Sequence, residues 1–467
     1  MVSILKQNKI ISATIVLTAA GVLTRCFGFV NRIFLSQLIG AKELGIYQMI
    51  TPIYMVVYSL TTYGITTSLT KLTAGILAKG EQKDAERLLK KAAVLTFLLS
   101  LFAFFIVFFG ADFICTYILG ASMLSKSLKV LAFSFFPVAL KGCILAYFLG
   151  MEKSGVHASS QLLEQIFRVG CIFLFAYCIP SISHDALLAV YGLVMGEYTS
   201  FLFSYFYFLR DKKKNNLNSS CITSTNIHPQ KVIVTNTTSG IKKEFEKEFG
   251  FRTFIHQSIP ITANKFFITL FASIEAILIP KMLLLYYQDL QIAMEEYGHL
   301  TGMALPFLQF PATITNSLAL ILLPVVSKEA SLEKSKRLQK LTRYCTFSCL
   351  LLGIFCTGFF YLTGPFLGEF VFHSSDAGNM IRRLSLLCPF LYLSSTMGSI
   401  LNGLNRMTSS FLYHLLSIGL RTFIILIFVP EYGLNAYFIG MLSSSFLHSI
   451  LQYADIRRTL AKKEEYK

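Results

Sequence analysis

RLLKKAAVLTFLLSL, residues 87–101, and RLQKLTRYCTFSCLL, residues 337–351, are two versions of one segment. Arg, Leu, Lys, Thr, Phe and Leu recur in the same order at a constant offset of 250 residues. Each copy runs from a basic start into a long apolar stretch, which is typical of a helix that enters a bilayer from its surface. The chain therefore contains an internal repeat, and the repeated segment is a candidate membrane helix.

The repeat continues beyond this segment. Further pairs follow in the same order in the two halves: Pro137 and Pro389, Gly150 and Gly403, Lys153 and Arg406, and Arg168 and Arg421. The last three pairs share an offset of 253 residues. One such match could arise by chance, but an ordered set indicates two homologous halves.

The composition is that of a membrane protein. The chain has 467 residues, of which 54% are hydrophobic and 14% charged, and its mean hydropathy is +0.60. A soluble domain carries about 25% charged residues. The net charge of +17 would suggest nucleic acid in a soluble protein, but basic residues collect in the cytoplasmic loops of membrane proteins. We therefore expect no nucleic-acid partner. The ten cysteines form no disulfide or zinc pattern, and no metal or cofactor is expected.

Apolar runs long enough to cross a bilayer predict about twelve membrane spans in an all-α polytopic protein. We expect them near residues 10–33, 46–72, 91–111, 127–150, 158–180, 185–209, 253–280, 299–326, 341–363, 384–401, 408–430 and 434–455. The first is read as a retained span and not as a signal peptide, because no small-residue cleavage site follows it. Of the Lys and Arg residues outside the spans, 29 lie on the side of the termini and 6 on the other. This bias predicts a multi-pass protein of the cell membrane with both termini in the cytoplasm.

The longest polar stretch divides the chain. Residues 211–252 are rich in Asn, Ser, Thr and Lys and predict a cytoplasmic linker. Residues 1–210 and 253–467 then form two six-helix lobes. Since both halves begin on the cytoplasmic side, the repeat is parallel, and transporters built in this way bind substrate between the halves.

Charged residues inside the spans are the candidate functional residues, because a charge at the bilayer centre costs about 2.5–3.5 kcal/mol on insertion scales. Cations outnumber the acidic residues Glu164, Glu197 and Glu275, and the predicted spans contain no Asp. An inward-facing cationic surface would suit an anionic phosphate group. The substrate-binding candidates are Arg25, Lys141, Arg168, Lys265 and Arg421, with Arg32, Glu164 and Glu197 as further candidates.

Structural explanations stay open for these charges. Glu164 and Arg168 are four residues apart on one helix and could neutralise each other. Arg32 lies near the end of its span and could extend to the membrane surface. Pairing between helices could account for the other cations without any ligand.

Three stretches carry a resemblance to a known family. TRCFGFVNRIFLSQLIGAKELGIYQMITPIY (24–54), SSQLLEQIFRV (159–169) and LPFLQFPATITNSLALILLPVVS (305–327) resemble the stage V sporulation protein B family of the multidrug/oligosaccharidyl-lipid/polysaccharide exporter superfamily. The first also resembles a motif of the lipid II flippases, whose arginines line a central cavity. Arg25 matches the first of these arginines, whereas the second falls on Asn31, one place before Arg32. Lipid II flippases commonly have fourteen spans, against about twelve here.

The resemblance implies a transporter and not an enzyme. It implies that the substrate is an undecaprenyl-diphosphate-linked oligosaccharide or peptidoglycan precursor, flipped to the outer leaflet for cell-wall, spore-cortex or surface polysaccharide synthesis. Its partners would be this anionic lipid-linked saccharide, membrane lipids and the cell-wall synthesis machinery. A drug/cation antiporter of the same superfamily, a multipass glycosyltransferase or polymerase, and a scaffold without transport activity are the alternatives.

Overall fold

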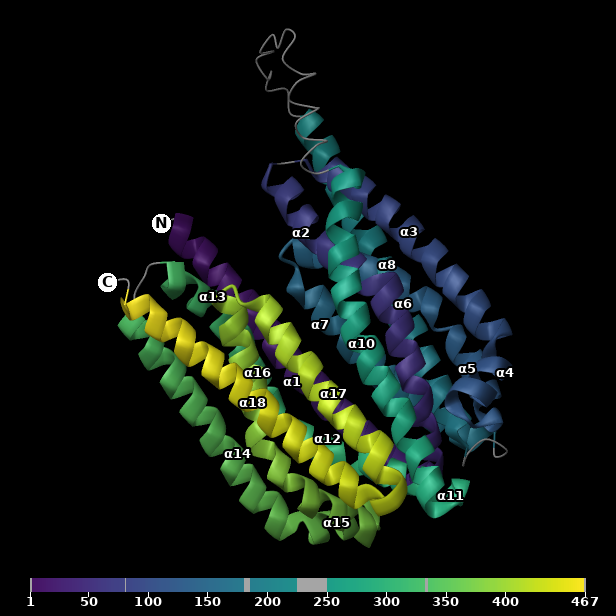
Figure 1. Ribbon diagram of the computed structural model, residues 1–467. Helices are drawn as coiled ribbons and strands as arrows, with labels where there is room; N and C mark the ends of the chain where they lie inside the picture. Colours follow the sequence, from purple (N-terminus) through teal and green to yellow (C-terminus); the bar gives the residue numbers. More distant parts are fainter. Residues whose placement is uncertain (1, 80, 180–184, 225–249, 332–334, 466–467) are drawn as a thin grey trace. The chain divides into compact units, whose positions relative to one another are not determined.

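The computed structural model describes residues 2–79, 81–179, 185–224, 250–331 and 335–465 (Figure 1). The regular secondary structure of these residues is helical throughout, as the apolar runs predict. The first half contains α1 (Val2–Tyr58), η1 (Ser59–Tyr63), α2 (Gly64–Ala78), α3 (Gln82–Phe109), α4 (Ala111–Phe113), η2 (Ile114–Leu119), η3 (Ser122–Leu124), α5 (Ser125–Ala132), α6 (Phe135–Gly150), α7 (Ser154–Cys178) and α8 (Ala186–Ser224). The second half contains α10 (Phe251–Tyr287), α11 (Leu290–Gly298), η5 (His299–Ala304), α12 (Leu305–Gln309), α13 (Ala312–Ser331), α14 (Ser335–Phe372), α15 (Ser375–Leu384), η6 (Ser385–Leu387), α16 (Cys388–Gly403), α17 (Met407–Tyr432) and α18 (Leu434–Glu465).

The chain is a multi-pass membrane protein. In the described residues, 9 helices are long and apolar enough to cross a bilayer, or up to 10 if the pair α5 and α6, bent by 40°, forms one span. One of these helical stretches, Gly21–Ala78, is 58 residues long and contains the first two predicted spans. The backbone near each predicted span is helical, although the eighth is divided into η5, α12 and α13.

Gly40 separates the first two predicted spans. Its backbone has φ 78° and ψ 173° inside an otherwise helical segment. This left-handed conformation strains residues with a β-carbon, whereas glycine adopts it readily. The change of direction between these spans therefore depends on a glycine at this position, and the hydropathy pattern alone does not reveal it.

The residues divide into two compact units. One contains Met1–Thr24, Ile53–Ile182 and Leu187–Leu270, and the other contains Arg25–Pro52, Ser183–Ala186 and Phe271–Lys467. The middle of α1 thus belongs to the second unit, and the first part of α10 belongs to the first. The predicted lobe boundaries at 210 and 253 stay a prediction. Helix α8 continues to Ser224, so residues 211–224 of the predicted linker are helical, and residues 225–249 lie outside the described part of the chain.

The turn between α6 and α7 is repeated between α16 and α17. Glu152 and Asn405, which are 253 residues apart, both have positive φ, at 60° and 63°. In the first half the Lys153 N–H donates to the Phe148 carbonyl at 2.9 Å, and 253 residues later the Arg406 N–H donates to the Leu401 carbonyl at 2.9 Å. The sequence repeat is therefore also a repeat of backbone geometry.

Side-chain contacts between helices repeat as well. Thr96 of α3 contacts the Cys143 sulfur of α6 at 3.2 Å, and Thr396 of α16 contacts the Cys349 sulfur of α14 at 3.0 Å. The two residue types are exchanged, but both contacts correspond at an offset of 253. The offset of 250 inferred from the sequence of this helix is therefore wrong by three residues, slightly less than one helical turn. Chance identities on successive turns produced the shorter offset.

A second interhelical contact supports the same register. Lys153 makes an ion pair with Asp211 of α8 at 2.6 Å, and the equivalent Arg406 makes one with Asp455 of α18 at 2.8 Å. In both halves, a cation at the start of the fifth helix thus binds an aspartate near the end of the sixth.

The helices bury small residues and expose large apolar ones. On α3, Ala92, Thr96 and Ser100 are fully buried, whereas Phe102 and Phe109 are 67% and 73% exposed. Small residues let membrane helices approach closely, and lipid covers the large apolar side chains. This arrangement explains why an apolar helix carries hydroxyl groups on its packed face.

Candidate functional site

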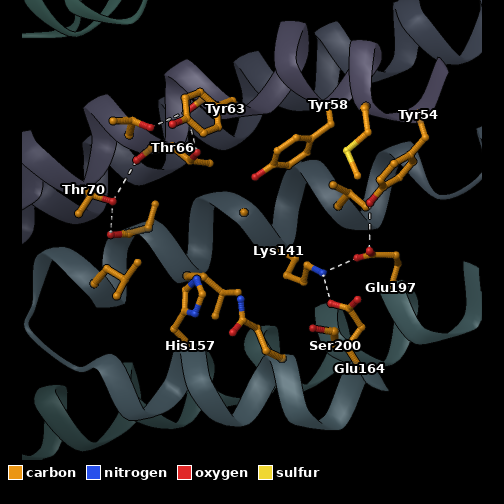
Figure 2. Close-up of a pocket in the computed structure, with 18 residues that line it drawn as sticks. Tyr54, Tyr58, Tyr63, Thr66, Thr70, Lys141, His157, Glu164, Glu197 and Ser200 are labelled. Carbon is orange, nitrogen blue, oxygen red and sulfur yellow. Dashed lines mark hydrogen bonds and ion pairs between the residues drawn. The ribbon is translucent and has the colours of Figure 1, made fainter. Parts of the chain in front are cut away.

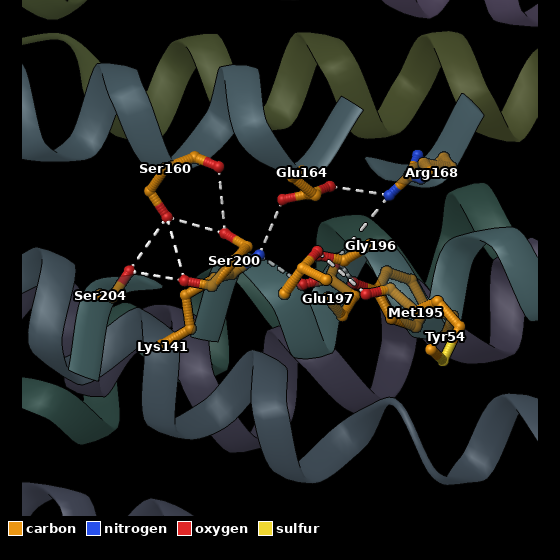
Figure 3. A network of polar contacts seen from close by, with 11 residues as sticks. Tyr54, Lys141, Ser160, Glu164, Arg168, Met195, Gly196, Glu197, Ser200 and Ser204 are labelled. Carbon is orange, nitrogen blue, oxygen red and sulfur yellow. Dashed lines mark hydrogen bonds and ion pairs between the residues drawn. The ribbon is translucent and has the colours of Figure 1, made fainter. Parts of the chain in front are cut away.

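Three helices of the first unit place polar residues on facing stripes. On α7, His157, Gln161, Glu164 and Arg168 follow helical spacing and so lie on one face. Lys141 lies on the facing side of α6, and Glu197 lies on α8. The side chains of Lys141, Glu164, Arg168 and Glu197 meet here (Figure 3), and we call these four residues the charged cluster.

Lys141 links the two carboxylates of the charged cluster. Its ammonium group is 2.8 Å from Glu164 and also donates a hydrogen bond to Glu197. Arg168 is 2.7 Å from Glu164 and 3.9 Å from Glu197. The Tyr54 hydroxyl donates to Glu197 at 3.1 Å. Two positive and two negative charges therefore balance at a site where Glu197 is only 5% exposed.

Close packing of α7 and α8 supports the charged cluster. A β-carbon at residue 196 would lie 3.0 Å from the Glu164 carbonyl oxygen, so only glycine fits this contact. One turn away, the Ser160 hydroxyl contacts those of Ser200 and Ser204 at 2.7 Å and 3.0 Å (Figure 3). These contacts fix the two helices that carry Glu164 and Glu197.

A pocket of about 510 Å³ opens beside the charged cluster (Figure 2). Lys141, Glu164 and Glu197 form one part of its lining. The rest is rich in uncharged hydrogen-bonding groups, namely those of Tyr54, Tyr58, Tyr63, Thr66, Thr67, Thr70, His157, Gln161 and Ser200. The hydroxyl of Tyr58 points into the space between α2 and α6 (Figure 2). The site thus combines aromatic rings, neutral donors and acceptors, and one lysine.

Lys265 lies next to this pocket. Its ammonium group is 5.2 Å from the ring centroid of Tyr63, which lines the pocket. Within the described part of the chain, Lys265 makes no ion pair with an acidic side chain. A cation over an aromatic face is stabilised by the ring, and it remains free to attract an anion.

The second unit holds Arg421 differently. Its guanidinium binds both carboxylate oxygens of Glu275 at 2.6 Å. Glu275 is 6% exposed, so the expectation that it lies in water near the outer face is wrong. The fork of the arginine explains this, because it can pair with both oxygens of a buried carboxylate.

The remaining candidates lie elsewhere. The side chain of Arg25 is exposed, and Arg32 is half-buried and donates to the Thr301 carbonyl at 3.3 Å. The structure therefore brings Lys141, Arg168, Glu164 and Glu197 together and places Lys265 beside the same pocket. Pairing, which the sequence left open, occurs for Lys141, Arg168 and Arg421. A role in substrate binding stays a prediction for every candidate.

Sequence reasoning missed the neutral lining of the pocket. Tyr54 and Tyr58 are one turn apart on α1, and His157 and Gln161 precede Glu164 on one stripe of α7. Polar residues at helical spacing in an apolar span were the available signal. Among the described residues, no group of His, Cys, Asp and Glu could hold a metal ion.

Comparison with known proteins identifies related chains. Residues 10–328 match the profile of a family described as polysaccharide biosynthesis protein. The chain is 24% identical over 466 residues to stage V sporulation protein B of Bacillus subtilis (strain 168), covering 97% of this chain and 85% of that protein. It is 21% identical over 428 residues to the lipid II flippase MurJ of the same organism, covering 86% of this chain and 74% of that protein.

Among solved structures, the chain resembles an inward-facing multidrug resistance MATE family transporter of the MOP superfamily. The TM-score is 0.69 at 13% identity, and the match covers 97% of this chain and 99% of the other. At this identity the likeness establishes the fold alone. The all-helical, two-lobed fold expected from the sequence is thereby confirmed.

Proposed function

The chain belongs to the polysaccharide biosynthesis protein family, and from this premise we propose that it carries a lipid-linked saccharide across the cell membrane. The substrate class is a polyprenyl-diphosphate-linked oligosaccharide or peptidoglycan precursor, moved from the inner to the outer leaflet. The observation that carries this proposal is the pocket of the first unit, where neutral hydrogen-bonding groups surround Lys141.

The pocket lining suits a sugar headgroup. Hydroxyl and amide groups both donate and accept hydrogen bonds, which matches the many hydroxyl and acetamido groups of a saccharide. Tyrosine presents an apolar ring and a polar hydroxyl together, so Tyr54, Tyr58 and Tyr63 can contact both the faces and the edges of a sugar ring. Ligand sites generally combine apolar surface with a few oriented polar groups in this way.

The cations supply binding for the diphosphate. Lys141 can exchange a carboxylate of the charged cluster for a phosphate oxygen, and Lys265 lies beside the pocket without an acidic partner among the described residues. A charge-assisted hydrogen bond to phosphate is stronger than one between neutral groups. The prenyl chain would stay in the lipid.

Alternating access completes the proposal. The two repeated halves, residues 1–210 and 253–467, act as lobes that expose the site first to the cytoplasm and then to the outside. Both termini lie in the cytoplasm. An inside-negative potential favours outward movement of an anion by about 2.3 kcal/mol per charge per 100 mV. The outer product would feed the synthesis of cell-wall, spore-cortex or surface polysaccharide.

One observation favours a second candidate. Glu164 and Glu197 both line the pocket, and buried carboxylates in a membrane protein can bind protons or cationic substrates. An antiporter that exchanges a cationic compound for protons is therefore the alternative function.

A reconstitution experiment tests the proposal. The protein is placed in vesicles with a polyprenyl-diphosphate saccharide, and a membrane-impermeant reagent measures how fast the sugar appears on the opposite face. We expect translocation that depends on the protein and is absent from empty vesicles. A folded protein that moves no lipid-linked saccharide, but exchanges a cationic dye for protons, would establish the antiporter instead.

A further inference from the structure

A second pocket lies in the second unit, near the turns that join α14 to α15 and α17 to α18. Its volume is about 510 Å³. Its polar lining consists of Tyr361, Asn379, Arg382, Arg383 and Asn435, and leucine, isoleucine and phenylalanine side chains form the remainder. A site with two arginines at one part and an apolar wall at another is amphipathic.

Neutral neighbours hold both arginines in place. The guanidinium carbon of Arg382 is 4.5 Å from the Tyr361 ring centroid, and one of its nitrogens is 3.3 Å from the Tyr361 hydroxyl. Arg383 donates to the Asn435 side-chain oxygen at 2.8 Å. Neither arginine makes an ion pair with any acidic side chain of the described residues. Each guanidinium has five N–H donors, so donors remain available for a ligand.

The first half of the chain provides an internal control. At the offset of 253 that relates the halves, Arg382 corresponds to Lys129, and Lys129 is paired with Asp112 at 2.8 Å. The position that corresponds to Asp112 is Pro365. The second half therefore keeps the cation of the repeat but lacks the acid that neutralises it.

The backbone confirms this register close to both positions. Gly120 and His373, 253 residues apart, have positive φ of 75° and 53°. The next N–H in each half accepts the same pairing, since Ala121 donates to the Cys115 carbonyl at 2.9 Å and Ser374 donates to that of residue 368 at 3.2 Å. The loss of the acid is thus a difference at equivalent sites.

A nearby carboxylate does not neutralise the pocket. Burial and the charge of Asp376 raise the pKa of Glu296 in α11, and Arg383 partly opposes this rise. Glu296 forms no ion pair with either arginine in the described structure. The two guanidinium groups therefore leave a surplus of positive charge.

We propose that this pocket binds the phosphate group of a membrane lipid. Paired guanidinium groups match phosphate oxygens through bidentate hydrogen bonds, and the apolar wall can receive the first part of a hydrocarbon chain. Helix ends are also where lipid headgroups lie. The positive-inside bias predicts that this end faces the outer leaflet. The inference does not depend on which substrate the first pocket transports.

Binding measurements on purified, delipidated full-length protein test the proposal. Native mass spectrometry in a neutral detergent would be used with phosphatidylglycerol, a polyprenyl diphosphate, zwitterionic phosphatidylcholine and inorganic phosphate as separate probes. We expect binding of an anionic phospholipid or the prenyl diphosphate, and the comparison of these two shows which lipid the site prefers. The variant Arg382→Gln/Arg383→Gln should bind at least about tenfold more weakly, and Arg382→Lys/Arg383→Lys should retain part of the affinity.

A matched variant controls for loss of net charge. Lys126→Gln/Lys129→Gln removes two cations around the equivalent position of the first half and should leave anionic-lipid binding unchanged. Thermal unfolding of each variant shows that it is folded. Equal binding by wild type and Arg382→Gln/Arg383→Gln would overturn the proposal, as would binding of inorganic phosphate without any binding of lipid.

Discussion

Replacement of Lys141 by Met should strongly destabilise the first unit. Lys141 is 12% exposed and lies between Glu164 and Glu197, which are 13% and 5% exposed. Its removal leaves two carboxylates with only Arg168 as a cationic neighbour in the charged cluster. Loss of one partner of a buried ion pair costs about 3–5 kcal/mol. At about 1.4 kcal/mol per factor of ten, the folding equilibrium should fall by roughly two to three orders of magnitude.

A second substitution should restore much of this loss. Lys141→Met/Glu197→Gln leaves one positive and one negative charge in the cluster, and Arg168 still contacts Glu164 at 2.7 Å. Denaturant unfolding in detergent, arranged as a double-mutant cycle, measures the coupling. Lys71→Met is the matched control, because Lys71 also lies in a predicted span but is exposed. If Lys141→Met unfolds like wild type, or if the double variant is no more stable than the single one, the balanced-charge argument is refuted.

Three further predictions concern other parts of the chain. Arg25→Ala should abolish flipping while the protein still accumulates in the membrane, and Arg25→Lys should keep part of the activity; a fully active Arg25→Ala protein would remove Arg25 from the substrate path. Cysteine labelling of intact cells should find residues 215–240 inaccessible from outside, whereas external labelling would reverse the orientation. Hydrogen bonds from Lys129 and Ser125 lower the pKa of Asp112, so its stabilising contribution is present above its unfolded pKa and is lost as the pH falls through the lower, folded value. The melting temperatures of wild type and Asp112→Asn should therefore differ at neutral pH and converge in acid, and a constant difference would contradict this.

The sequence predicted most of the fold because membrane helices are determined by length and apolarity. The first two expected spans were separate runs, and the structure joins them through the positive φ of Gly40. Hydropathy contains no information on such a bend, since any glycine in an apolar run gives the same signal. The repeat was likewise visible, but side-chain contacts such as Thr96 with Cys143 were needed to fix its register.

The candidate site was predicted only in part. Glu164 and Arg168 could be paired from their spacing of four residues on one helix. The partners of Lys141 and Arg421 include residues 56 and 146 positions away, and a single sequence does not show which distant helices adjoin. The sequence therefore gave a surplus of cations within the spans, whereas the folded charged cluster is neutral.

The central claim is that the pocket of the first unit receives the headgroup of a lipid-linked saccharide. The most direct test is translocation by Lys141→Met/Glu197→Gln, which keeps the charged cluster balanced but removes the lysine from the pocket lining. We predict a folded protein whose rate of polyprenyl-diphosphate saccharide translocation, measured in vesicles beside wild type, falls at least about tenfold, as expected when one charge-assisted hydrogen bond is lost. Translocation by this variant at the wild-type rate would contradict the claim.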